Sequence, residues 1–319
     1  GFIMDTKYTF SNFPLDAIFR SMAPFIANLE QTFHITAVCG QIAGGRAMGL
    51  SNSKSDNDFD IFYEQAEGFT PPGLKYIQEV TICGKPVVVE FNFINFRKLV
   101  NAAKTALSQE HQGYPTTFYR SASEAESFLP ENILPRWERS EYLFTKFHTF
   151  IMGDNYWYAA SSQFDICPYW KMEKTIDALD YYFVRAYGNY QNYLTASAPL
   201  HVRRYLNCIW QTLSLEWILT RGTKPPVHIK HLIEEMVTSP SLKDSIYHFY
   251  DLNCNSDIDK KDLFCTSDDT INQYIFRSLC RYKEELHNYN RSETIYDLMQ
   301  RTPPAERSIG YLIPVSTVS

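Results

Sequence analysis

A glycine pair and a set of alternating acids stand out as residues that could do chemistry. Gly44 and Gly45 are adjacent, and Asp56, Asp58 and Asp60 follow at every second position. Adjacent glycines let the backbone approach a ligand closely and turn its N–H groups toward an anion such as a triphosphate. Carboxylates gathered on one face repel each other unless a cation lies among them, and their hard oxygen atoms suit Mg²⁺. This stretch therefore predicts a phosphate-binding turn beside a magnesium site, an arrangement that suits phosphoryl transfer.

A further acid, Glu90, interrupts an otherwise apolar run that the sequence predicts as a strand. Two β-rich runs, 76–82 and 86–93, are separated by a short segment with Gly84, which suits a hairpin. An acid is costly to bury without a partner. Glu90 is therefore either a solvent-facing residue of an edge strand or a metal partner of the aspartates. The neighbouring aspartate cluster favours the metal ligand.

The elements that must position these residues follow from the periodicity. Side chains alternate along a strand, so the three aspartates would share one face of a strand while Phe59 and Ile61 point to the other. A preceding strand, predicted at 35–41, ends at the glycines. Helical spacing is predicted over 16–33, with Pro24 near a first turn, and over 96–107, 171–194, 200–220 and 228–237.

These elements predict an α/β (α+β) fold, with a small mixed sheet followed by an all-helical C-terminal domain. Prolines interrupt the segment 108–169, which is a candidate linker or lid. We place the domain boundary near its start. The first domain, 1–115, would carry the chemistry, and 116–319 would be the helical domain with the linker or lid at its N-terminal end.

Composition narrows the class of protein. The formal net charge is −6 and the pI is near 5.8, so a polynucleotide would need a local basic patch. Seven cysteines without a CxxC pair indicate neither a disulfide framework nor a zinc site. The chain has no apolar run of about 18 residues and no signal pattern, so we expect a soluble, cytoplasmic protein without a membrane segment.

Several motifs resemble the DNA polymerase beta superfamily, and within it the predicted nucleotidyltransferases associated with RNA-repair ligases. Residues 44–50 and 55–58 resemble that family's opening motif, G-S-R-x-x-G-h…S-D-x-D. Residues 88–99 are similar to its acid strand and R-K helix, and 204–227 resembles its C-terminal helix, which ends in a G-T-x-P-P turn. The serine usual after the first glycine is Gly45 here, which removes a hydroxyl that could touch a phosphate.

The resemblance implies a nucleotidyltransferase that moves a nucleoside monophosphate from an NTP, for example ATP, to an acceptor hydroxyl and releases pyrophosphate. It implies two Mg²⁺ ions as cofactors. The catalytic and metal-binding residues would be Asp58, Asp60, Asp56 and Glu90. The residues that bind the NTP phosphates would be Gly44, Gly45, Arg46, Lys54 and Ser55.

Two pairings of the aspartates with the family motif stay open. Gap-free spacing from the glycines selects Asp56 and Asp58, whereas the superfamily's alternation of acid and apolar residues selects Asp58 and Asp60. The residue between two ligands should face the core, and Phe59 does so better than Asn57. This argument favours the second pairing, and Asp58 belongs to the site in either case.

The resemblance to RNA-repair nucleotidyltransferases favours an RNA end as the acceptor. Acceptor binding would fall on basic residues that gather within one part of an otherwise acidic chain, because such clusters bind phosphates. RNA or tRNA would bind through Arg203, Arg204, Arg221, Lys224 and Lys230. Two alternatives remain. The protein could be a nucleotide-binding or antitoxin-like partner with little turnover, or an enzyme that nucleotidylates a protein or a small molecule.

Overall fold

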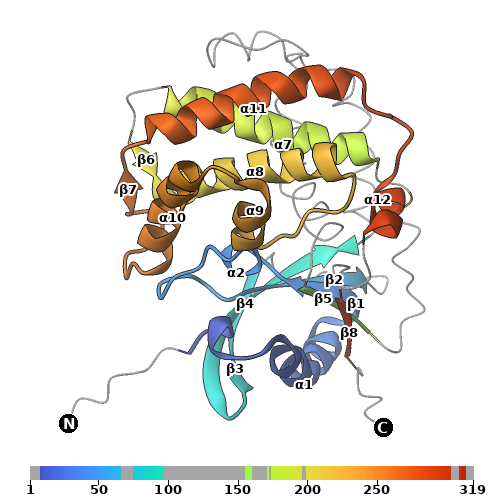
Figure 1. Cartoon of the computed structure of the whole chain (residues 1–319). Helices are drawn as coiled ribbons and strands as arrows, with labels where there is room; N and C mark the ends of the chain where they lie inside the picture. The colour runs from blue at the N-terminus through green and yellow to red at the C-terminus, as the bar shows by residue number, and fades with distance from the viewer. Residues whose placement is uncertain are drawn as a thin grey trace, which may run out of the picture.

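A mixed β-sheet lies between one long helix and a group of helices in the computed structural model, which describes residues 8–65, 75–96, 155–159, 171, 174–195, 199–302 and 309–313 (Figure 1). The strands of this sheet are β1 (Ile35–Ile42), β2 (Asp58–Gln65), β3 (Lys75–Ile82), β4 (Lys85–Asn95), β5 (Asn155–Ala159) and β8 (Ile309–Ile313). Below the sheet in Figure 1 lies α1 (Leu15–Phe33), which follows the short helix η1 (Phe10–Asn12). Above it lies the helical part of the chain.

The helical part begins after β5. Its longer helices are α7 (Thr175–Asn189), α8 (Val202–Arg221), α10 (Pro240–Cys254) and α11 (Asp269–His287). Its shorter elements are η2 (Tyr190–Leu194), α9 (Ile229–Met236), α12 (Ile295–Arg301) and the two-stranded pair β6 (Leu200–His201) and β7 (Phe264–Cys265). The predicted α/β class, with a mixed sheet followed by helices, is confirmed.

The strand order is β3-β4-β2-β1-β5-β8. Neighbouring strands are antiparallel except for the pairs β2–β4 and β5–β8, which are parallel. The predicted hairpin is confirmed as β3 and β4. Its turn residues, Cys83 and Gly84, both have positive φ angles of 49° and 75°, as a two-residue turn between twisted strands requires.

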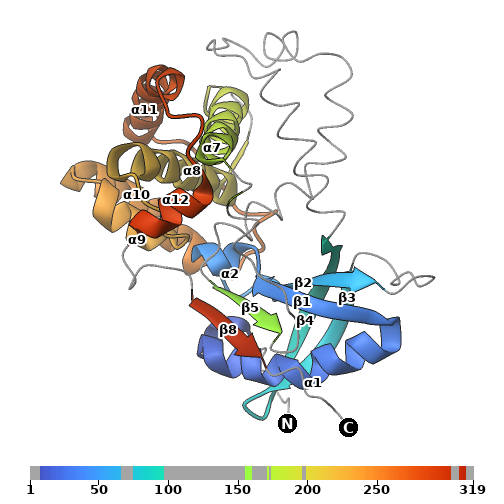
Figure 2. The ribbon, with the colours of Figure 1, turned by 90° about the vertical axis from the view of Figure 1, so that its right-hand side faces the viewer.

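Helix α1 covers one face of the sheet (Figure 2). Its apolar stripe includes Phe19, whose ring meets Phe59 of β2 edge-on at 6.1 Å, and Phe59 meets Phe91 of β4 at 5.9 Å. The sequence placed Pro24 at the start of a helix, and this expectation is wrong, because Pro24 lies inside the single helix α1. The continuous apolar stripe holds the helix against the sheet across the proline.

The other face of the sheet turns toward the helical part. Phe62 of β2 and Ile94 of β4 belong to the same buried cluster as Tyr205 and Trp217 of α8. Because side chains alternate along a strand, Asp58 and Asp60 share the face of Phe62, and Glu90 shares the face of Ile94. The acids therefore face the helices, on the opposite side of the sheet from α1.

The predicted helices of the C-terminal part are found at 175–189, 202–221 and 229–236, with small shifts at their ends. Helix α8 ends at Gly222, whose φ of 64° provides a left-handed cap. Among the described helices, none combines the length and the apolar composition that a membrane span needs. The predicted helix 96–107 beyond its first residue, and nearly all of the 108–169 segment, lie outside the described residues.

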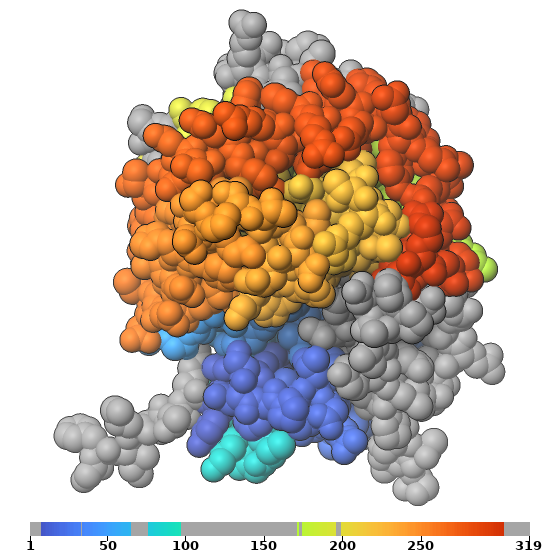
Figure 3. Space-filling view, in the orientation of Figure 1, coloured from blue at the N-terminus to red at the C-terminus, as the bar shows by residue number. Residues whose placement is uncertain are grey.

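The sheet and the helical part are closely joined. Strands β5 and β8 come from the chain beyond residue 115, and they extend the sheet at the side of β1. Leu50, just after the glycine turn, is buried in the cluster of the helical part. In Figure 3 the blue surface of this N-terminal region lies directly below the orange helices. The domain limits 1–115 and 116–319 stay a prediction.

Candidate functional site

The glycine turn brings the backbone against an acid. β1 ends just before Gly44, which adopts φ 68° and ψ −148°, and the short helix α2 (Gly45–Met48) follows. A Cβ atom added to Gly44 would lie 3.1 Å from Oδ2 of Asp58. Glycine is needed here both for its positive φ and for this close approach. The carboxylate of Asp58 thus lies beside the first glycine of the predicted phosphate-binding turn.

Asp58 and Glu90 lie opposite each other. The parallel pairing of β2 with β4 sets Asp58 against Glu90 and Asp60 against Asn92. Both Asp58 and Glu90 are partly buried. β4 lies between β3 and β2, so Glu90 is not on an edge strand, and that alternative is removed. Two acids on neighbouring strands therefore share one face of the sheet, and Asp58 lies beside the glycine turn.

Asp60 lies deeper and is fully buried. Its Oδ2 accepts a hydrogen bond from Nε2 of Gln41 at 2.9 Å, and its Oδ1 accepts one from Nδ2 of Asn92 at 3.0 Å. These two amides orient the Asp60 carboxylate. Sequence reasoning missed Gln41 and Asn92. The alternation that placed the acids on one face would have placed Asn92 there too.

Asp56 is exposed, whereas Asn57 is buried. Oδ1 of Asn57 accepts from the backbone N–H of Phe10 at 3.0 Å, and its Nδ2 donates to the carbonyl oxygen of Val88 at 2.9 Å. Asn57 therefore fastens the start of β2 to η1 and to β4. Asn57 is thus buried, as Phe59 is, and the sequence did not indicate that Asn57 would be buried.

The carboxylate oxygens of Asp58, Asp60 and Glu90 are suitable ligands for a hard cation, although the three groups do not surround a single point. Among the described residues, no three acidic, histidine or cysteine side chains form a preassembled metal site. Asp58 and Glu90 are partly buried neighbours on two strands, and Asp60 is oriented by two amides. Oxygen donors of this kind fit Mg²⁺, which is bound by one or two carboxylates together with substrate phosphates.

Arg46 ties several loops together. Its Nη1 donates to Oγ of Ser11, and its Nη2 donates to the carbonyl oxygen of Ser55 at 3.0 Å. Burial lowers the pKa of Arg46, and the carboxylates of Asp58 and Asp56 oppose that shift. The guanidinium therefore lies near the acids while it holds the loop that leads to β2.

The other two predicted phosphate ligands lie in that same loop. Lys54 is exposed, and its backbone N–H donates to Oδ1 of Asn52 at 2.9 Å. Oγ of Ser55 accepts from the backbone N–H of Asn52 at 2.8 Å. Ser55 therefore closes a tight turn, and Lys54 extends from it toward solvent.

Arg46→Lys is expected to lower the free energy of unfolding by about 1–2 kcal/mol, because one ammonium group cannot reach both Ser11 and the Ser55 carbonyl. Chemical denaturation measures this. The matched control is Arg20→Lys, which changes an exposed arginine on α1 paired with Asp16. Normal stability together with a raised KM for NTP would show instead that Arg46 acts mainly on the triphosphate.

The helical part holds the loop after the glycine turn through side chains that the sequence did not single out. Nδ2 of Asn52 donates to the carbonyl oxygens of Asn253, at 3.2 Å, and Ile258, at 3.0 Å. In return, Nδ2 of Asn253 donates to the carbonyl oxygen of Leu50 at 2.9 Å. The ring of His228 lies against Gly49. The end of α10 and the start of α9 therefore fix the turn from the helical side.

The predicted RNA-binding cations lie in different surroundings. The guanidinium of Arg203 lies against Gly45, and that of Arg204 covers the ring of Tyr193 at 4.0 Å. Arg221 pairs with Glu235 at 3.1 Å. Lys230 is exposed at the start of α9. The side chain of Arg203 therefore contacts the glycine turn, whereas the side chains of Arg204 and Lys230 lie elsewhere on the helical part.

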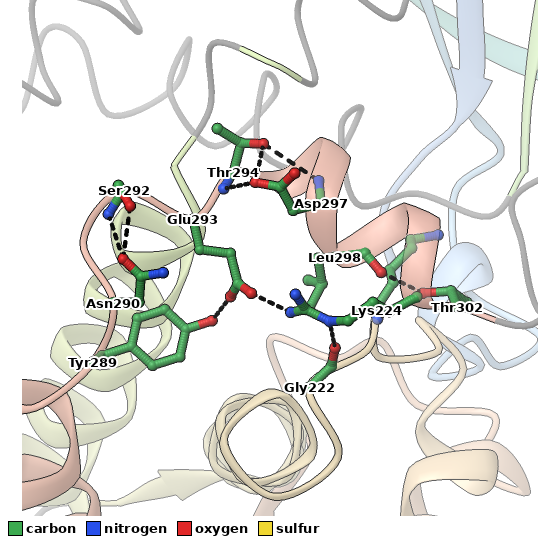
Figure 4. A network of polar contacts seen from close by, with 11 residues as sticks. Gly222, Lys224, Tyr289, Asn290, Ser292, Glu293, Thr294, Asp297, Leu298 and Thr302 are labelled. Atoms are coloured by element: carbon green, nitrogen blue, oxygen red, sulfur yellow. Dashed lines mark hydrogen bonds and ion pairs between the residues drawn. The ribbon is translucent and has the colours of Figure 1, made fainter.

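Lys224 is buried, with 3% of its surface exposed, so its side chain is not on the outer surface. Its backbone N–H donates to Oγ1 of Thr302 at 2.9 Å, within a polar network that joins the end of α8 to α12 (Figure 4). In the same network Arg301 donates to the carbonyl oxygen of Gly222 at 2.8 Å and pairs with Glu293. This network fixes the turn after α8.

The site thus consists of a glycine turn with Asp58 beside Gly44 and with Glu90 opposite Asp58 on the neighbouring strand. Residues 172–301 match the model of the RNA repair pathway DNA polymerase beta family, RlaP. This match confirms the resemblance to the nucleotidyltransferases of the polymerase beta superfamily that was seen in the sequence. The matched segment is the helical part and does not include the sheet. No curated protein matches the chain.

Proposed function

We propose that this protein is a Mg²⁺-dependent nucleotidyltransferase that moves a nucleoside monophosphate from an NTP to an acceptor hydroxyl, with RNA ends as the favoured acceptors. The observation that carries the proposal is the position of the Asp58 carboxylate, beside Gly44 and opposite Glu90. In this arrangement a triphosphate on the turn would have its reacting phosphate next to the acids. The family match of the helical part supports the same chemistry.

Each residue has a role in this proposal. The backbone of Gly44 and Gly45 binds the β- and γ-phosphates. Asp58 and Asp60 would hold the Mg²⁺ ions, with Asp56 as the alternative to Asp60, and Glu90 would hold the ion nearer to the acceptor. Bound Mg²⁺ would stabilise the charge that develops on the transferred phosphate. Gln41 and Asn92 keep the Asp60 carboxylate in its orientation through their amides.

The test is incubation of the protein with each labelled NTP, Mg²⁺ and a set of RNAs, followed by measurement of pyrophosphate. Mass spectrometry of the RNA, of the protein and of small-molecule acceptors identifies the product. We expect pyrophosphate release that depends on Mg²⁺ and RNA that gains one nucleotide. NTP binding without pyrophosphate release would favour a nucleotide-binding partner protein, and a label on protein or on a small molecule would replace RNA as the acceptor.

Arg204→Glu is expected to weaken RNA binding and to reduce its dependence on salt, because a lost phosphate contact releases fewer counterions. Arg204 is half-buried and its guanidinium lies over the ring of Tyr193, so its side chain offers both charge and a stacked plane. Fluorescence anisotropy with labelled RNA at several salt concentrations measures this. Lys243→Glu on α10 is the control, because Lys243 is a cation of the helical part whose charge is already paired with Glu234. Equal binding by the Arg204 and Lys243 variants would remove Arg204 from the RNA surface.

A further inference from the structure

Arg203 is an arginine of the helical part that lies against the phosphate-binding turn. It is in the first turn of α8, and its guanidinium fills the space that a side chain at position 45 would need, since a Cβ added to Gly45 would collide with it. Nη1 of Arg203 also donates to the carbonyl oxygen of Leu50 at 3.1 Å. The guanidinium therefore contacts the segment 45–50 at both ends of α2.

Among the described residues, no carboxylate is in direct contact with the Arg203 guanidinium. Within the part of the chain that the structure describes, its hydrogen bonds go to neutral oxygens, those of Leu50 and of Asn207, the latter at 3.2 Å. Burial lowers the pKa of Arg203 to about 10, and the Asp58 carboxylate is among the groups that oppose this shift. A partly buried cation without an ion pair is costly to keep unless an anion binds there.

We propose that Arg203 is the residue through which the helical part contacts the triphosphate of the bound nucleotide, so that the anion site is built from both the sheet and the helices. This rests on the proposed function. The fork of N–H groups on a guanidinium can donate to phosphate oxygens while it keeps its bond to Leu50. Gly45, which stands where the sequence resemblance expects a serine, leaves the room that Arg203 occupies.

Arg203 therefore binds the nucleotide and is not part of the RNA-binding surface to which the sequence analysis assigned it. Arg46, by comparison, is held by Ser11 and Ser55 on the other side of the loop. The two arginines would act differently on the same turn, with Arg46 bracing it through η1 and the loop before β2, and Arg203 reaching the ligand from α8.

The experiment uses inorganic tripolyphosphate as the probe and isothermal titration calorimetry of the whole chain, because neither turnover nor a nucleoside is then needed. Arg203→Gln is expected to weaken tripolyphosphate binding by about 10- to 100-fold, as loss of a charge-assisted contact does. Arg203→Lys, which keeps the charge without the fork, should lie between this variant and the wild type. The control is Arg277→Gln on α11, which removes an exposed arginine and should leave binding unchanged.

Gly45→Ala supplies an independent variant, because it keeps Arg203 and displaces its guanidinium. It should weaken binding as Arg203→Gln does, and the double variant should be no weaker than either single variant, since both remove the same contact. Melting curves without ligand confirm that each variant is folded. Tripolyphosphate should raise the melting temperature of the wild type and of Arg277→Gln, and do so much less for Arg203→Gln.

The outcomes separate this inference from the proposed function. Tripolyphosphate binding that is equal in Arg203→Gln and Arg277→Gln would overturn the inference, even if the wild type transfers nucleotides. The absence of tripolyphosphate binding to the wild type would overturn it as well. Binding that depends on Arg203 in a protein that releases no pyrophosphate from any NTP would support the inference while the transfer reaction is disproved.

Discussion

Asp58→Asn should reduce nucleotidyl transfer by about three orders of magnitude or more, while the protein stays folded. The asparagine has the same shape, but it removes the charge that lies beside Gly44 and opposite Glu90. A loss of this size corresponds to about 4 kcal/mol of transition-state stabilisation. The measurement is Mg²⁺-dependent pyrophosphate release at saturating NTP.

Melting curves accompany the assay. Without Mg²⁺, Asp58→Asn should be as stable as the wild type or more stable, because it relieves repulsion between neighbouring carboxylates. Mg²⁺ should raise the melting temperature of the wild type and not that of the variant. The matched control is Asp16→Asn, which changes an exposed acid on α1 at the other face of the sheet. It should change neither the rate of pyrophosphate release nor the effect of Mg²⁺ on the melting temperature. Full activity in Asp58→Asn would disprove the magnesium site and the transferase assignment together.

Asp60→Asn should also abolish most of the transfer, and unlike Asp58→Asn it should destabilise the fold. Asp60 is fully buried between the amide groups of Gln41 and Asn92, which both donate to it. An asparagine would turn one N–H₂ group toward a donor, which costs about 1–3 kcal/mol. Asp56→Asn, at an exposed position, should leave stability unchanged and reduce the rate only slightly.

Comparison of these two variants decides between the two pairings of the aspartates. Pyrophosphate release and chemical denaturation are measured for both variants under the same conditions. Greater loss of activity in Asp60→Asn would support Asp58 with Asp60. If Asp56→Asn is the more damaging change while Asp60→Asn loses stability alone, Asp60 is a structural residue and Asp56 is the second ligand.

Local patterns predicted the elements around the site well. The β3–β4 hairpin follows from two alternating runs and a turn with Gly84, and α8 follows from helical spacing that stops at Gly222. The position of Asp58 beside the glycines could be predicted because the segment 43–57 begins with the glycines and leads directly into β2, the antiparallel neighbour of β1. These features depend on residues close together in sequence, where backbone preferences decide the outcome.

Contacts between distant segments could not be predicted in the same way. The side chain of Asn52 donates to the backbone of Asn253, and the side chain of Asn253 donates to the backbone of Leu50, yet nothing in either stretch marks its partner. Arg203 and Arg204 are adjacent in sequence, yet one lies against Gly45 and the other covers Tyr193. The number of basic residues in a stretch does not show where each side chain points, because that depends on its face of the helix and on what packs against it.

The parallel pairing of β5 with β8 has a consequence for how the protein is made. During synthesis on the ribosome, β8 follows α7 to α12, so all the helices that the structure describes are translated before the outer strand of the sheet exists. Until then the edge of β5 can pair with other chains, which is a known route to aggregation. Closing so long a loop is also slow. We therefore expect chaperones to protect the exposed edge of β5 in the nascent chain. The complete sheet should form late, after translation of the helices.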